Sequence, residues 1–134
     1  MRSTRIVTSF IKNSDQILIL KRSEKVRSMK GLWSGVSGMI ENNENPLDRA
    51  KIEIFEEIGM KEDEIKLVKK SEKMKISSSQ YKNHQWEIFP FLFETKKETI
   101  QLNWENSDFK WILPIELKNY ETVPSLEKLL FNLL

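Results

Sequence analysis

The sequence of 134 residues contains no cysteine, one histidine (His84) and only four glycines. Without cysteine, disulfide bonds and thiolate metal sites are excluded, and the chain suits a reducing compartment. A bound metal must then be held by oxygen atoms or by His84, and oxygen ligands favour a hard cation such as Mg²⁺ or Mn²⁺. Because polar residues precede His84, we place it in a loop.

Long apolar runs are also missing, since no stretch approaches the roughly 20 apolar residues that cross a bilayer. The N-terminus lacks the pattern of a secretory signal. The 22 basic and 20 acidic residues nearly balance, which argues against a dedicated nucleic-acid-binding surface. We therefore predict a cytoplasmic protein without a membrane partner. Its length fits one domain over residues 1–134, and the sequence leaves monomer and homodimer open.

Several β-strands are expected from the distribution of β-branched, aliphatic and aromatic residues. Arg5–Lys12 and Gln16–Lys21 predict a β-hairpin around a polar turn. Pro90 lies inside a later strand and suggests that this strand is an edge strand or carries a bulge. The further expected strands are Leu32–Glu41 (one strand or two short ones), Ile65–Ser79 (with a mobile polar end), Gln85–Thr95 and Phe109–Leu113.

Helices are expected in three places. Asn45 and Pro46 open a helix that Gly59 ends, because Asn is a good N-cap, Pro suits the first helical position and Gly adopts the left-handed C-cap. A helical turn is expected at 114–117, and a final helix opens near Thr122 and Pro124. The interspersed strands and helices predict an α+β fold, or a mixed sheet between helices. The apolar stripes are Leu47, Ala50, Ile54 and Ile58 in the first helix, and Leu126, Leu129, Leu130 and Leu133 in the last.

The first helix also carries three glutamates, Glu53, Glu56 and Glu57. Residues three and four apart are neighbours on a helix, so Glu53 lies beside the other two, at a cost of a few tenths of a kcal/mol per like-charged pair. A divalent cation would convert this repulsion into coordination. Adjacent glutamates by themselves, however, more often form only a solvated helix face.

The residues around these glutamates decide between the two interpretations. The stretch from Gly38 to Met60 resembles the Nudix box, with six Gly or Glu positions and two bulky aliphatic positions in register. With each residue type used at roughly 7 %, a chance match of the six has a probability of about one in ten million per starting point. Segments 31–33 and 111–114 also resemble the family. The matching box residues are Gly38, Glu44, Glu53, Ile54, Glu56, Glu57, Gly59 and Met60.

One box position departs from the family pattern. Ile52 stands where the family usually has an Arg that orients the catalytic glutamates, and an aliphatic side chain cannot do this. Arg49 lies one turn before Glu53 and is a candidate substitute, although an ordinary solvated Arg is the more common case. Glu44 is expected to support the junction between the loop and the helix.

The resemblance implies a Nudix-type α/β/α sandwich with a mixed β-sheet flanked by helices, and a Mg²⁺-dependent hydrolase (Mn²⁺ is possible) acting on a small nucleotide. Glu53 or Glu105 is the implied general base. The implied catalytic and metal-binding residues are Glu53, Glu56, Glu57 and Glu105, and the implied substrate-binding residues are Arg22, Ser37, Gly38 and Trp33. Trp33 and Trp86 are candidates for stacking on a base, against the more common role of tryptophan in a core.

Three functions remain open. The first is hydrolysis of a nucleoside triphosphate to the monophosphate and pyrophosphate, or of ADP-ribose or a nucleotide sugar. The second is a catalytically weak Nudix-fold module that binds a nucleotide, for which Ile52 is the one supporting feature. The third is a small α+β domain with an acidic helix and no ligand. Retention of all the helix glutamates favours the first.

Overall fold

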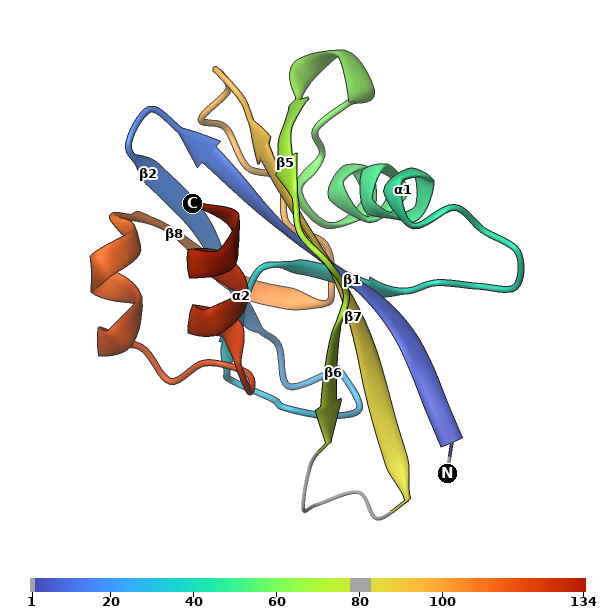
Figure 1. Ribbon diagram of the computed structural model, residues 1–134. Helices are drawn as coiled ribbons and strands as arrows, with labels where there is room; N and C mark the ends of the chain where they lie inside the picture. Colours follow the sequence, from blue (N-terminus) through green and yellow to red (C-terminus); the bar gives the residue numbers. More distant parts are fainter. Residues whose placement is uncertain (1, 78–82) are drawn as a thin grey trace.

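A computed structural model describes residues 2–77 and 83–134. Within these residues eight strands form one mixed sheet, and α1 and α2 lie on its two opposite faces (Figure 1). The α+β sandwich predicted from the sequence is therefore confirmed. The elements are β1 (Arg2–Asn13), β2 (Gln16–Arg22), β3 (Trp33–Ser34), β4 (Val36–Met39), α1 (Pro46–Ile58), η1 (Glu62–Glu64), β5 (Lys66–Lys70), β6 (Met74–Ser77), β7 (His84–Glu94), β8 (Asn106–Ile112), η2 (Pro114–Asn119) and α2 (Leu126–Leu133).

The long strand β1 organises the sheet. It pairs in parallel with β7 along its whole length, from Arg2 opposite His84 to Lys12 opposite Glu94. On its other side it pairs antiparallel with β4 near its middle and with β2 at its end. β2 in turn carries β3 and β8, and β7 carries β5 and β6. This arrangement places β4 and the start of α1 beside the centre of the sheet.

Both faces of the central strands are buried, because successive side chains of a strand point to opposite faces. One set packs under α1 and the other packs under α2, and each set joins a separate hydrophobic core. The four leucines predicted for the last helix are all buried. The strand residues under α1 are Val7, Ile11, Leu18, Leu20, Phe91 and Phe93, and those under α2 are Phe10, Ile17, Ile19, Ile88 and Leu92.

The expectation that Pro90 marks an edge strand is wrong, whereas the alternative of a bulge has a counterpart nearby, since the pairing of β5 with β7 shifts register between Leu67 and Lys69. β7 lies between β1 on one side and β5 and β6 on the other, and its register with β1 is unbroken. The Pro90 carbonyl accepts a bond from Ser71 N at 3.4 Å, so Pro90 faces the gap between β5 and β6. No ladder hydrogen bond is lost there, and an interior strand therefore tolerates the missing N–H.

Other expectations hold with shifted boundaries. The hairpin, the two short strands after it and the turn at 114 are present. His84, expected in a loop, begins β7 instead, where its Nε2 lies 2.6 Å from Thr4 Oγ1. The last helix begins at Leu126, later than expected, after Ser125 in a left-handed conformation. The predicted strand 65–79 divides into β5 and β6, and its last two residues lie outside the described part of the chain. No helix among the described residues is long and apolar enough to cross a membrane.

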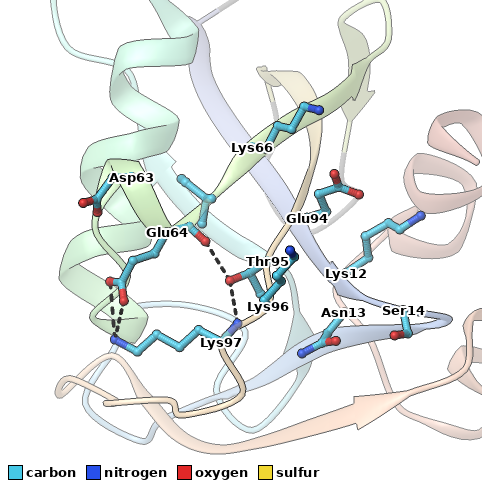
Figure 2. Close-up of a pocket in the computed structure, with 11 residues that line it drawn as sticks. Lys12, Asn13, Ser14, Asp63, Glu64, Lys66, Glu94, Thr95, Lys96 and Lys97 are labelled. Atoms are coloured by element: carbon cyan, nitrogen blue, oxygen red, sulfur yellow. Dashed lines mark hydrogen bonds and ion pairs between the residues drawn. The ribbon is translucent and has the colours of Figure 1, made fainter.

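An open cleft of about 770 Å³ lies beside the turn that joins β1 and β2 and the end of β7 (Figure 2). Lysines and acidic side chains both line it, and Lys97 pairs with Glu64 at 3.1 Å. None of the residues predicted to form a site lines this cleft. The carboxylates of α1 lie outside this cleft.

Candidate active site

Local sequence signals fix the helix that carries the glutamates. The Asn45 side chain accepts hydrogen bonds from Leu47 N at 2.8 Å and Asp48 N at 3.4 Å, and so caps the first turn. Gly59 ends the helix with φ 75°, and its N–H donates to the Phe55 carbonyl. Both ends agree with the sequence prediction. The helix therefore has one defined register, in which Glu53 and Glu57 lie on the buried side.

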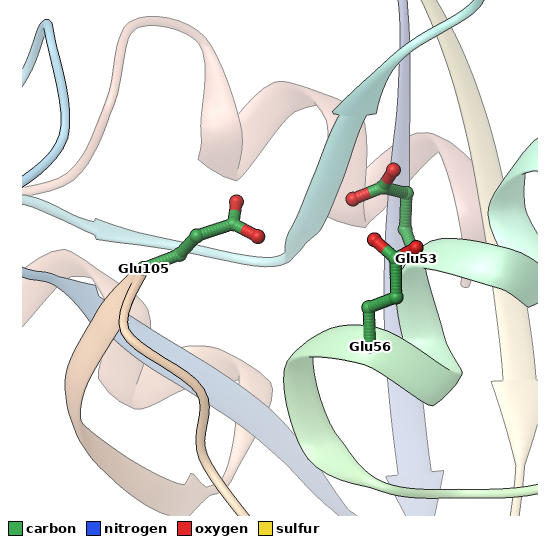
Figure 3. A group of neighbouring side chains, drawn as sticks. All are labelled: Glu53, Glu56 and Glu105. Atoms are coloured by element: carbon green, nitrogen blue, oxygen red, sulfur yellow. The ribbon is translucent and has the colours of Figure 1, made fainter.

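Three carboxylates meet at one end of the sheet. Oxygen atoms of Glu53, Glu56 and Glu105 all lie within 4.8 Å of one another, and the three side chains converge in Figure 3. Glu105 is the residue just before β8. Asn103 fixes it twice, since Asn103 Nδ2 donates to Glu105 Oε1 and Asn103 Oδ1 accepts from Glu105 N, both at 3.0 Å. The structure thus brings together residues 50 positions apart that the sequence predicted to share a site.

Glu57 lies beside this cluster but is more deeply buried, with 3 % of its surface exposed. Asn106 Nδ2 donates to its Oε1 at 2.9 Å, while its Oε2 has no hydrogen-bond partner. Burial and the nearby Glu105 charge raise the pKa of Glu57 well above its usual value. Glu57 also lies close enough to Glu53 to share a hydrogen bond with it, so a proton or a bound cation relieves the repulsion between the two carboxyl groups. The sequence did not indicate the contact with Asn106.

Glu53 forms an ion pair with Arg49 on one side. Arg49 Nη1 donates to Glu53 Oε2 at 3.0 Å, and Arg49 also binds Glu44. Burial raises the pKa of Glu53, and the hydrogen bond from Arg49 opposes that shift. The expectation that Arg49 is an ordinary solvated residue is wrong, because its side chain is only 13 % exposed. Glu44 supports the junction between the loop and the helix, as predicted.

Gly38 lies directly against Glu53. A Cβ atom built on Gly38 would overlap the Glu53 carboxyl group, so only glycine leaves room for this side chain. The preceding residue, Ser37, places its hydroxyl 3.3 Å from Thr8 Oγ1 and 3.4 Å from Ser34 Oγ. The end of β4 therefore connects the carboxylates to a row of hydroxyl groups.

These hydroxyls line a cavity of about 140 Å³. Arg22 lies at the same wall, where its Nε and Nη2 each donate to the Ser28 carbonyl at 3.1 Å. Burial lowers the pKa of Arg22, and attraction to Glu57 and Glu105 opposes that change. The cavity is connected to the carboxylates through β4, because Ser37 lines it and the next residue, Gly38, lies against Glu53. Its remaining lining is mainly apolar and includes Ile6, Met29, Ile76, Trp86, Ile88, Val123, Pro124 and Leu129.

The two candidate tryptophans lie in different places. Trp33 is 8 % exposed and packs edge-on against Tyr120, with ring centroids 5.4 Å apart. It does not line the cavity. Trp86 does line it, together with Ile76 and Ile88 from the same end of the sheet. The sequence predicted a strand around Trp86 but could not indicate that this side chain lines a cavity.

The donor set of the site suits a hard divalent cation. It consists of carboxylate oxygens from Glu53, Glu56 and Glu105, which lie within 4.8 Å of one another, and the buried carboxyl of Glu57 lies beside them. Mg²⁺ and Mn²⁺ prefer such oxygen ligands. The described residues therefore fit the metal that the sequence predicts.

Comparison with known proteins identifies the family. The NUDIX domain family matches residues 2–133, and the chain therefore belongs to the Nudix hydrolases, a family of pyrophosphohydrolases. Dihydroneopterin triphosphate diphosphatase from Haemophilus influenzae is 26 % identical over 96 % of this chain and 87 % of its own length.

Solved structures share the fold at lower sequence identity. The MutT protein from Methanosarcina mazei superimposes with a TM-score of 0.76 at 18 % identity, covering 98 % of this chain and 92 % of that one. The Nudix domain of Shewanella oneidensis NrtR, solved with ADP ribose, has a TM-score of 0.75 at 12 % identity, covering 98 % of this chain and 88 % of that one. These likenesses concern the fold alone.

Proposed function

We propose that this hydrolase is Mg²⁺-dependent and cleaves a nucleoside triphosphate to the monophosphate and pyrophosphate. The observation that carries the proposal is the meeting of Glu53, Glu56 and Glu105 within 4.8 Å beside a cavity with one cationic and several hydroxyl groups. The carboxylates suit the metal that a polyphosphate needs. The cavity suits the nucleoside, because binding sites for small molecules are mostly apolar with a few placed polar groups.

In this proposal the glutamates have distinct tasks. Glu56, Glu57 and Glu105, together with Glu53, bind the cation, which when bound neutralises phosphate charge and lowers the pKa of a water molecule. Glu53 or Glu105 takes the proton of the attacking water. Attack at phosphorus breaks its bond to the bridging oxygen, and the two phosphate products leave.

The remaining predicted residues bind the substrate. Arg22 lines the cavity, and its charge is attracted to the buried Glu57 and the half-buried Glu105. It is therefore placed to bind a phosphate between the nucleoside and the metal. Ser37 contributes its hydroxyl to the cavity, and Gly38 allows Glu53 to approach the β4 backbone. We assign base stacking to Trp86 in preference to Trp33, because Trp86 lines the cavity.

A second candidate activity is hydrolysis of ADP-ribose or a nucleotide sugar. It is favoured by the structural likeness to the domain solved with ADP ribose. The name of the Haemophilus relative favours a triphosphate instead. A purely nucleotide-binding role is disfavoured by the ion pair between Arg49 and Glu53, which supplies a cationic partner despite the presence of Ile52.

Product analysis tests the proposal. The purified protein is incubated with Mg²⁺ and a panel of nucleoside triphosphates, ADP-ribose and dinucleoside polyphosphates, each with an EDTA control. Metal-dependent release of monophosphate and pyrophosphate from triphosphates is the expected result. Glu56→Gln should lose this activity, while Glu127→Gln, an exposed carboxylate on α2, should retain it. Absence of turnover across the panel, with Mn²⁺ as well, would reject the proposal.

A further inference from the structure

Arg49 donates hydrogen bonds to two carboxylates, one in the loop before α1 and one on α1. Its Nε donates to Glu44 Oε1 at 2.9 Å and its Nη2 donates to Glu44 Oε2 at 2.6 Å. The remaining Nη1 donates to Glu53 Oε2 at 3.0 Å. One partly buried guanidinium thus connects a loop carboxylate before α1 to a site carboxylate on α1.

The far end of this connection is itself fixed. Glu44 Oε1 accepts the backbone N–H of Glu41 at 2.7 Å, so the carboxylate that holds Arg49 is tied to the chain. A planar guanidinium that binds one carboxylate through two parallel bonds has little rotational freedom left. Its third donor therefore points in one direction, and that direction is occupied by Glu53.

Glu53 is confined on its other side by Gly38. The absence of a Cβ at Gly38 lets the carboxyl lie against β4, and Arg49 binds one of its two oxygens. Glu53 also offers a carboxylate oxygen to the group that it forms with Glu56 and Glu105. The orientation of Glu53 is thus determined by two contacts, one steric and one ionic.

Ile52 cannot make either contact. It is 40 % exposed and apolar, although it occupies the box position where Arg is usual. In this chain the arginine that binds Glu53 is therefore at position 49, about one helical turn before position 52.

We propose that Arg49 is the positioning residue of this site: held by Glu44, it fixes the Glu53 carboxylate over Gly38 so that Glu53 converges with Glu56 and Glu105. This rests on the proposed function, in which Glu53 binds metal or activates water. Arg49 itself touches neither substrate nor metal in this assignment. Its effect on turnover is exerted through the orientation of Glu53.

The first test compares Arg49→Ala and Arg49→Lys with the wild type. Residues that orient metal ligands typically change activity or metal affinity by roughly 10- to 100-fold. We expect Arg49→Ala to lower kcat within that range and to leave KM within about threefold. Lys51→Ala removes a cation from the same helix that pairs with Glu62 away from the cluster, and should leave kcat unchanged. Arg49→Lys should fall between, because an ammonium cannot bind both carboxylates as a fork.

The second test separates positioning from folding and from the proposed function. Mn²⁺ binding, measured by electron paramagnetic resonance without substrate, should weaken by roughly 10-fold in Arg49→Ala. Adding Ile52→Arg to Arg49→Ala should recover at least part of both Mn²⁺ affinity and kcat. Wild-type kcat and Mn²⁺ affinity in Arg49→Ala would overturn the inference. So would a loss that neither Arg49→Lys nor Ile52→Arg reduces, because that pattern marks a contribution to folding alone. If the wild type itself hydrolyses no nucleotide, the proposed function fails, while the Mn²⁺ measurements still decide the role of Arg49.

Discussion

Gly38 lies directly against the carboxyl group of Glu53. A Cβ atom at position 38 would overlap this carboxyl group, so any larger residue there must displace the Glu53 side chain. The first prediction follows from this contact. Gly38→Ala should lower kcat/KM at least 10-fold, since Glu53 must turn away from Glu56 and Glu105. Because the displaced atoms are the end of a flexible side chain, the unfolding temperature of Gly38→Ala should fall by only a few degrees relative to the wild type. Met39→Ala, at the exposed neighbouring position, should leave kcat/KM unchanged, and equal values for both variants would contradict the prediction.

A second prediction concerns the buried carboxyl of Glu57. Burial raises its pKa in the folded state, so the folded chain binds this proton more tightly than the unfolded chain. The stabilisation is fully present below the unfolded pKa of about 4.3 and is lost as pH rises through the raised folded pKa. Metal-free wild type should therefore lose stability towards neutral pH through this group. Glu57→Gln should lose turnover yet unfold at a temperature a few degrees higher in EDTA at pH 7.

Calorimetry across pH checks this second prediction. The difference in unfolding temperature between Glu57→Gln and wild type should shrink as the pH falls towards 4, because Glu57 is then protonated in both states. Saturating Mg²⁺ should reverse the order at pH 7, since only the wild type retains all four carboxylates. A pH-independent difference between the two proteins would contradict the assignment.

The third prediction concerns the size of the heterocyclic base in the substrate. The cavity of about 140 Å³ is close to the roughly 150 Å³ of an engineered protein cavity that holds one benzene molecule. We expect pyrimidine triphosphates to have a higher kcat/KM than purine or pterin triphosphates. Trp86→Ala enlarges this cavity and should shift the ratio towards the double-ring substrates. A preference of the wild type for double rings, measured by competition, would show that the cavity opens on binding.

Arg22 provides the fourth prediction. Hydrogen bonds to charged groups contribute about 1.5–3 kcal/mol, and every 1.4 kcal/mol corresponds to a tenfold change in affinity. Arg22→Ala should therefore raise KM for the triphosphate by roughly 10- to 100-fold. Arg27→Ala removes an exposed cation from the same connection between β2 and β3 and serves as the control. Equal KM values for the two variants would place the phosphates elsewhere.

Local signals explain why much of the fold and of the site was predictable. Asn45 and Gly59 define the ends of α1 through their own backbone preferences, and the spacing of the glutamates then follows from the helical period. Likewise, the aliphatic residues of β2 and the leucines of the last helix predicted these elements before their partners were known. Such features depend on neighbours in the sequence and need no knowledge of the tertiary structure.

Other features depend on residues that are distant in the chain. Arg49 was expected to be solvated because its burial requires the loop carboxylate of Glu44 to fold back over it. Pro90 was expected at an edge because the gap between β5 and β6 cannot be read from β7 itself. The open cavity beside Trp86 likewise depends on where residues 123–129 pack over the sheet. These outcomes follow from tertiary arrangement and not from local pattern.

The parallel pairing of β1 with β7 also affects when the protein can work. Arg2 pairs with His84 and Lys12 with Glu94, so the middle of the sheet joins segments about 80 positions apart. Such long-range pairing forms slowly, because a long loop must close before its contacts stabilise it. Glu105 follows later still in the order of synthesis. A nascent chain that has exposed only its first hundred residues therefore carries the helix glutamates without Glu105, so the cluster of three carboxylates forms only after residue 105 has emerged.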